Sequence, residues 1–295
     1  MGGADDGGDV GDGDDVRDDG GVGDGGDVGD DDRGSEGGTV AVERGDGVED
    51  GFRGGTRPDD SVALRLGQSL LAVVAALVAG AALAPWAGRL GLALGVAPES
   101  PEFVAVRSAG QFVGFALAMV VFLAYANDRD LVSLRRPTRH EAGLVPVAAG
   151  GLVLAQFALV LVLQAVGIGV ATNRALTPGQ DAPRYFLYMV AVSILLVGPA
   201  EELVFRGVVQ GELRKALSAP PAIGLAAFLF GSLHFVAGTG TIVEQTAYVL
   251  VATLLALPLG YLYEATGNLT VPAVTHGLYN AVLYLVQYAD ATGFV

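Results

Sequence analysis

The strongest constraint in this sequence is a succession of apolar runs that begins after Ser61. Each run is close to the ~20 residues that an α-helix needs to cross the hydrocarbon core of a bilayer. Seven such runs lie at about 62–86, 108–126, 142–171, 186–212, 221–239, 246–263 and 268–289. Gly, Ala and Ser recur within them, and small residues allow helices to pack closely in lipid. We therefore predict an all-α fold, a polytopic bundle of transmembrane helices.

Residues 1–60 have a different composition, dominated by Asp and Gly. They hold 20 of the 32 acidic residues and 5 of the 17 basic ones, so residues 61–295 carry twelve of each and no net charge. Such a segment buries too little apolar surface to offset its chain entropy. We predict two parts: a disordered acidic tail over 1–60 and a membrane domain over 61–295. The lack of a basic footprint argues against a nucleic-acid partner.

The basic residues indicate the orientation in the membrane. The segment 127–141, between the second and third runs, contains Arg129, Arg135, Arg136 and Arg139. Loops rich in Lys and Arg lie on the cytoplasmic side. We therefore expect a multi-pass protein of the cell membrane, surrounded by lipid, with a cytoplasmic N-terminus. A single lysine, Lys215, beside many arginines and acidic residues is typical of a halophilic archaeon.

The fourth run contains three charged residues, Glu201, Glu202 and Arg206. Each charge costs about 2.5–3.5 kcal/mol near the centre of a membrane helix unless its surroundings compensate it. Glu202 and Arg206 are four residues apart, which suits an ion pair on one helix face. Glu201 lies about 100° around the helix and has no partner in its own segment. Pro199 cannot donate a hydrogen bond to the carbonyl of Leu195, so we expect a kink just before the two glutamates.

Polar residues also interrupt the fifth and seventh runs. The fifth contains His234, and the seventh contains His276 with Asn280 one turn later on the same face. The third histidine, His140, lies in the basic segment. A buried ion pair or an interhelical hydrogen bond can simply hold helices together, so each residue also has a structural interpretation. We nevertheless expect one site near the middle of the membrane, formed by Glu201, Glu202, Arg206, His234, His276 and Asn280.

The spacing of these residues resembles a known family. The chain resembles the CPBP (CAAX protease and bacteriocin-processing, Abi) family of intramembrane proteases in three motifs: Glu201-Glu202-x-x-x-Arg206, Phe230-x-x-x-His234 and His276-x-x-x-Asn280. The resemblance covers a motif core of about 186–290. It implies a bundle of about eight helices, which widens our expectation to seven or eight spans. It also implies an endopeptidase similar to the type II CAAX prenyl endopeptidase, which removes three residues after a prenylated cysteine from membrane-associated proteins or peptides.

Hydrolysis of a peptide bond at membrane depth needs an activated water and donors for the tetrahedral oxyanion. The chain has no cysteine and no evident Ser-His-Asp set, which argues against a covalent nucleophile. We expect Glu201 to act as general base on the water and His234 to orient that water. His276 and Asn280 would donate to the oxyanion. The pair of Glu202 and Arg206 would hold the helix face and aim the base.

Three alternatives remain open at this point. His234, His276 and Glu201 would suit the three ligands of a catalytic zinc ion, although there is no His-Glu-x-x-His helix. We prefer metal-independent glutamic chemistry, with no cofactor, over one zinc ion. A proton-coupled transporter would also place such charges at a broken helix, but the sequence shows no internal repeat. The third possibility is an inactive family member that acts as a binding or immunity protein.

Overall fold

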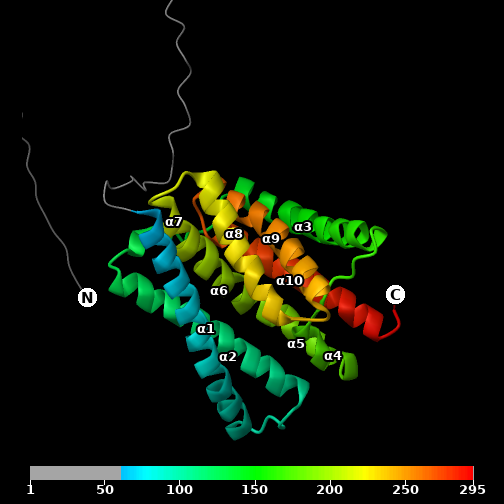
Figure 1. The fold of residues 1–295 in the computed structure, drawn as a ribbon. Coiled ribbons are helices and arrows are strands. Elements are labelled where there is room, and N and C mark those ends of the chain that lie inside the picture. The colour runs from blue at the N-terminus through cyan, green and yellow to red at the C-terminus, as the bar shows by residue number, and fades with distance from the viewer. Residues whose placement is uncertain (1–60, 295) are drawn as a thin grey trace, which may run out of the picture. The chain divides into compact units, whose positions relative to one another are not determined.

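The computed structural model describes residues 61–294, and these residues are almost entirely helical (Figure 1). The predicted disordered tail lies outside the described residues. The all-α prediction is confirmed. In chain order the elements are α1 (Val62–Ala93), α2 (Pro101–Tyr125), η1 (Arg129–Leu131), α3 (Arg139–Ala165), β1 (Thr172–Asn173), η2 (Arg174–Leu176), α4 (Thr177–Asp181), α5 (Arg184–Val192), η3 (Ser193–Val197), α6 (Gly198–Glu202), η4 (Leu203–Gln210), α7 (Gly211–Arg214), α8 (Ala219–Ala237), β2 (Gly238–Thr239), α9 (Ile242–Thr266) and α10 (Thr270–Ala291).

The predicted polytopic bundle is confirmed, although the expected seven or eight spans are slightly more than the candidates found. Within residues 61–294, six helices are long and apolar enough to cross a membrane: α1, α2, α3, the composite helix Arg184–Arg214, α8 and α9. The seventh predicted run, 268–289, does form a helix, α10, but it is not among the six. Polar residues such as Thr275, His276 and Asn280 lower its hydropathy. α10 instead packs against α3, α5 and α6 within the bundle.

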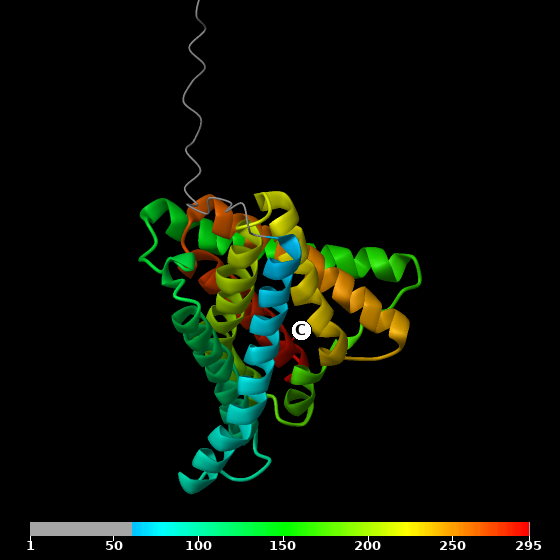
Figure 2. The ribbon, with the colours of Figure 1, turned by 60° about the vertical axis from the view of Figure 1, so that its left-hand side comes forward.

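Helices α1 and α2 form a long antiparallel hairpin (Figures 1 and 2). Each helix begins at a serine whose side chain accepts a backbone N–H, Ser61 for α1 and Ser100 for α2, both at 3.2 Å. The two helices approach each other very closely at Gly114. A Cβ atom there would lie 2.6 Å from the carbonyl oxygen of Ala79. Small residues thus set the packing of this hairpin, as expected for helices in lipid.

The composite helix from Arg184 to Arg214 is not regular. Two π-helical stretches, η3 and η4, flank the short α-helical turn α6 that carries both glutamates. Pro199 lies in the first turn of α6 and has no N–H to offer the preceding turn. The distortion expected near this proline therefore takes the form of a change in helical pitch on both sides of α6. Such π-helical turns are frequent at functional sites.

A very close crossing joins this distorted helix to α10. A Cβ atom on Gly198 would lie 2.5 Å from the carbonyl oxygen of Ala273. A Cβ atom on Gly277 would lie 2.9 Å from the carbonyl oxygen of Ser193. The two backbones can approach this closely only because both positions lack a side chain. The crossing brings His276, the neighbour of Gly277, against the glutamates of α6.

A cluster of charged side chains ties the start of α1 to the end of the composite helix. Glu212 accepts from Arg65 and from Lys215, both at 2.8 Å, and only 1% of Glu212 is exposed. Lys215 also contacts Asp128, in the loop after α2. This charged cluster lies at the same end of the helices as the basic segment that precedes α3.

Candidate functional site

The site is built around a buried ion pair. Glu202 and Arg206 lie one turn apart, with 2.9 Å between Oε1 and Nη1, and their side chains are 0% and 2% exposed. The second guanidinium nitrogen of Arg206 donates to the carbonyl of Ala256 on α9 at 2.7 Å. The guanidinium carbon lies 5.2 Å from the centre of the Phe230 ring on α8. The pair thus ties its own helix to two neighbouring helices.

His276 on α10 lies between the two carboxylates. Its Nδ1 is 2.8 Å from Oε1 of Glu202, and its Nε2 is 3.6 Å from Oε2 of Glu201. Glu202 therefore holds both the guanidinium and the imidazole. Glu201 is different: its side chain is 18% exposed, and it makes no hydrogen bond within residues 61–294. It is the carboxylate of the pair that a water molecule or a substrate can reach.

His234 joins this group through the ring of Phe230. That ring lies 4.7 Å from the ring of His234 and 5.7 Å from the ring of His276, measured between centroids. Nδ1 of His234 lies 3.0 Å from the carbonyl oxygen of Phe230. Since a carbonyl only accepts, Nδ1 carries the hydrogen, and Nε2 of the neutral ring is left as an acceptor. Phe230, which the motif contains, is thus the point where the three motif segments meet.

Asn280 is placed one turn after His276 on α10 and is half-buried. Its side chain makes no hydrogen bond with the part of the chain that the structure describes. Of the six residues predicted to converge, the structure brings four into direct contact. His234 joins them through the ring of Phe230. Asn280 lies one turn after His276 on the same helix. The four in direct contact are Glu201, Glu202, Arg206 and His276.

Sequence reasoning missed Tyr248 on α9. Its ring packs edge-on against His234, 5.3 Å away between centroids. Its hydroxyl oxygen accepts from the side-chain amide of Asn173 at 2.9 Å. Asn173 belongs to β1, which pairs antiparallel with β2 at Gly238. No local pattern singles out a tyrosine in an apolar span or an asparagine in a distant loop, so only the folded chain reveals this support for His234.

Three buried polar atoms near the crossing of α10 have no hydrogen-bond partner in the described chain: Oγ of Ser193, Oε2 of Glu202 and Oγ1 of Thr275. Buried polar groups are nearly always satisfied, and exceptions gather at sites that bind or react. The contact between the composite helix and α10 therefore contains unpaired polar atoms close to the two glutamates.

The arrangement can also be compared with the needs of a metal ion. Among residues 61–294, no three His, Asp or Glu side chains are grouped so that they can hold one. Nδ1 of His276 is engaged by Glu202 at 2.8 Å, and Nε2 faces Glu201 at 3.6 Å. As arranged here, Glu201, His234 and His276 do not form the three-ligand set that a catalytic zinc requires.

Comparison with known proteins agrees with the motifs. Residues 183–282 match the family described as type II CAAX prenyl endopeptidase, Rce1-like, which confirms the predicted resemblance. The uncharacterized protein YpbD of Bacillus subtilis is 33% identical over 88 residues, which cover 30% of this chain and 40% of that protein. The chain thus matches less than half the length of this relative. No solved structure matches. Together with the six apolar helices, the family match identifies a multi-pass membrane protein.

The buried ion pair gives a first prediction. Replacing Arg206→Met leaves the charge of Glu202 buried with only His276 beside it, and we expect a loss of about 3–5 kcal/mol in the free energy of unfolding. Adding Glu202→Gln removes that charge, so the double variant should be more stable than Arg206→Met alone. Thermal unfolding in detergent measures both effects.

The matched control is Arg184→Met, which breaks the exposed pair of Arg184 and Glu102. An exposed pair contributes little, so this variant should unfold almost like the parent. The interpretation of Glu202 and Arg206 as the anchor of the site is wrong if Arg206→Met is no less stable than Arg184→Met.

Proposed function

Because residues 183–282 belong to the Rce1-like family of type II CAAX prenyl endopeptidases, we propose that this protein is an intramembrane endopeptidase. It hydrolyses peptide bonds of membrane-associated, CAAX-type substrates with a water molecule that Glu201 activates. One observation carries the proposal: Glu201 is a reachable carboxylate beside His276, and its neighbour Glu202 is locked in a buried ion pair. A free base next to a fixed one is a suitable arrangement for general-base catalysis.

We propose that the water binds between Glu201 and His234. The carboxylate of Glu201 accepts hydrogen bonds, and so does Nε2 of His234, because Nδ1 already donates to the carbonyl of Phe230. A water that donates to both keeps its oxygen lone pairs for attack on the scissile carbonyl. Glu201 takes a proton as the water attacks and returns it to the leaving amine. Tyr248 and Asn173 fix the ring of His234 from behind.

His276 and Asn280 supply the donors for the oxyanion. When Nδ1–H of His276 donates to Glu202, Nε2 carries a hydrogen in the cationic form of the ring. The unpaired amide of Asn280, one turn further along α10, is the second donor. Prearranged donors of this kind contribute several kcal/mol to transition-state stabilisation.

The test of this mechanism uses the purified protein in liposomes with a peptide that carries a prenylated cysteine followed by three residues. We expect the parent protein to release the three residues. Glu201→Gln should lower kcat by roughly 10²–10⁴-fold, because an amide cannot accept the proton of the water. The release of the tripeptide is followed by mass spectrometry.

Glu102→Gln is the matched control, since it makes the same change at a partly exposed carboxylate on α2 that contacts Tyr188 and Arg184. It should cleave like the parent. If Glu201→Gln cleaves as fast as Glu102→Gln, Glu201 is not the base. If the parent leaves the peptide intact, the CAAX-type substrate is wrong.

We further propose that the reaction needs no metal ion. Of the three side chains that would hold zinc, His276 already has both ring nitrogens facing carboxylates, and no three-ligand group occurs among residues 61–294. Incubation with phenanthroline, followed by removal of the chelator, should leave the rate of peptide cleavage unchanged. Complete loss of cleavage that added zinc restores would replace this proposal with a metallopeptidase.

We propose that the basic segment 127–141 lies in the cytoplasm. Because α1 and α2 cross the membrane in opposite directions, the N-terminus then lies in the cytoplasm as well. The natural chain has no cysteine, so a single introduced thiol reports the side on which it lies. In intact cells, a membrane-impermeant maleimide should label Ala97→Cys, in the loop between α1 and α2. It should label Leu134→Cys only after the cells are permeabilised. The opposite pattern would invert the topology.

A further inference from the structure

The end of the α1–α2 hairpin far from the charged cluster carries two exposed arginines. The guanidinium of Arg89 lies 4.8 Å from the centre of the Trp86 ring, and that of Arg107 lies 5.9 Å from the centre of the Phe103 ring. Neither arginine contacts a carboxylate within residues 61–294. An arginine exposed on an apolar helix is costly unless it lies at the membrane surface or meets an anion.

The length of α1 places these arginines at the membrane surface. Arg65, in the charged cluster at the other end, and Trp86 are roughly 21 residues apart, or ~32 Å along a helix. This matches the ~30 Å thickness of the hydrocarbon core, and tryptophan favours the boundary between lipid and water. A Cβ atom on Gly88 would lie 3.1 Å from Cγ of Arg107. Arg107 therefore lies at the level of Trp86, in the leaflet opposite the charged cluster.

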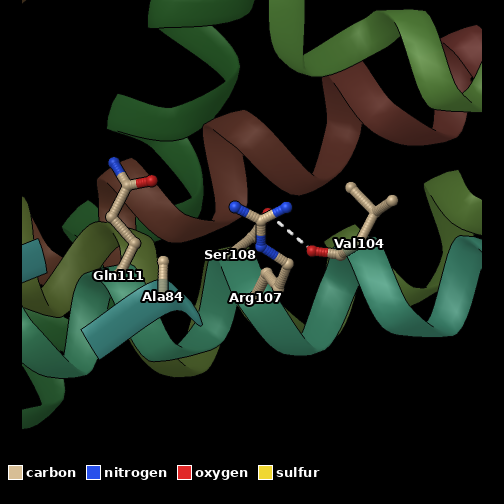
Figure 3. A pocket seen from close by; sticks show the side chains of 5 residues that line it. All are labelled: Ala84, Val104, Arg107, Ser108 and Gln111. Atoms are coloured by element: carbon tan, nitrogen blue, oxygen red, sulfur yellow. Dashed lines mark hydrogen bonds between the residues drawn. The ribbon is translucent and has the colours of Figure 1, made fainter. Parts of the chain in front are cut away.

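A cavity of about 170 Å³ opens at this level (Figure 3). It is lined by Ala84, Val104, Arg107, Ser108 and Gln111. Figure 3 shows the side chains of Arg107 and Gln111 projecting to the same side of α2. The hydroxyl of Ser108 is already used, since it donates to the carbonyl of Val104 at 3.0 Å. The guanidinium of Arg107 and the amide of Gln111, which makes no hydrogen bond in the described chain, remain as free donors.

The depths of these two donors match the order of groups in a phospholipid. α2 runs inward from Pro101, so Gln111 lies one turn, ~6 Å, deeper in the membrane than Arg107. In a phospholipid the phosphate is outermost, the ester carbonyls lie deeper, and the acyl chains follow. A guanidinium suits a phosphate, and an amide N–H suits a carbonyl oxygen. Ala84 on α1 gives the cavity an apolar wall for the acyl chain. It packs directly against α2, since a Cβ atom on Gly110 would lie 3.5 Å from the Cα of Ala84.

We propose that this cavity binds the phosphodiester of a membrane phospholipid, with Arg107 on the phosphate and Gln111 on an ester carbonyl. The site lies on the hairpin that precedes the family-matched segment, and it does not depend on the proposed protease activity. A lipid held here would join the outer end of the hairpin to its leaflet while the charged cluster fixes the inner end. It would thereby stabilise the position of α1 and α2 against the rest of the bundle.

Thermal unfolding of the purified, delipidated full chain in detergent tests the proposal. Three probes are compared: phosphatidylglycerol, a diacylglycerol with the same acyl chains, and inorganic phosphate. A ligand that binds only the folded state raises Tm. We expect phosphatidylglycerol to raise Tm of the parent and the other two probes to leave it unchanged. Arg107→Gln should remove more than half of the shift, and Gln111→Leu should remove part of it.

Arg129→Gln is the control, because it removes the same charge from an exposed arginine of the basic segment. It should keep the full shift. The proposal is overturned if diacylglycerol stabilises as well as phosphatidylglycerol, which would show acyl binding alone. It is equally overturned if inorganic phosphate stabilises as well, which would show a site for free anions, or if Arg107→Gln and Arg129→Gln respond alike.

Discussion

A charged pair buried among apolar helices needs hydrogen-bond partners from its neighbours. In this structure the pair is Glu202 and Arg206, and three helices pack around it. Glu202 and Arg206 are almost completely inaccessible. Arg206 also donates to a backbone carbonyl of α9, and Oε1 of Glu202 also contacts the imidazole of His276 on α10. Oε2 of Glu202 has no hydrogen-bond partner within residues 61–294. Because an unpaired charge in this position is so costly, the pair selects the packing in which three helices come together.

The same packing separates two adjacent glutamates into different roles. Glu202 is held in the ion pair, whereas Glu201, about 100° around the helix, is partly exposed and lies 3.6 Å from Nε2 of His276. A fixed carboxylate holds the scaffold, and a free one is available for chemistry. This division is the basis of the general-base role that we propose for Glu201.

Some features of the fold could be predicted from local sequence patterns, and others depend on tertiary contacts. Apolar runs located every long helix, because hydropathy depends on neighbouring residues alone. The expected number of spans is slightly above the six candidates, because the polar content of α10 places it outside them. Pro199 signalled a distortion, but its π-helical form was set by the packing around it. Nor did any pattern reveal that Gly198 and Gly277 allow two backbones to come into contact.

The sequence by itself determined which chemical groups enter the membrane: the adjacent glutamates, the arginine one turn later, and two histidines on separate apolar runs. Those follow from residue type and spacing, which are local properties. Only the tertiary structure decided that His276 bridges both carboxylates, that the carbonyl of Phe230 sets the tautomer of His234, and that Tyr248 supports that ring. The contacts of His276 and Tyr248 join separate helices, so they depend on how closely those helices approach, and that distance is fixed by packing. The contact between Phe230 and His234 lies within one helix, one turn apart.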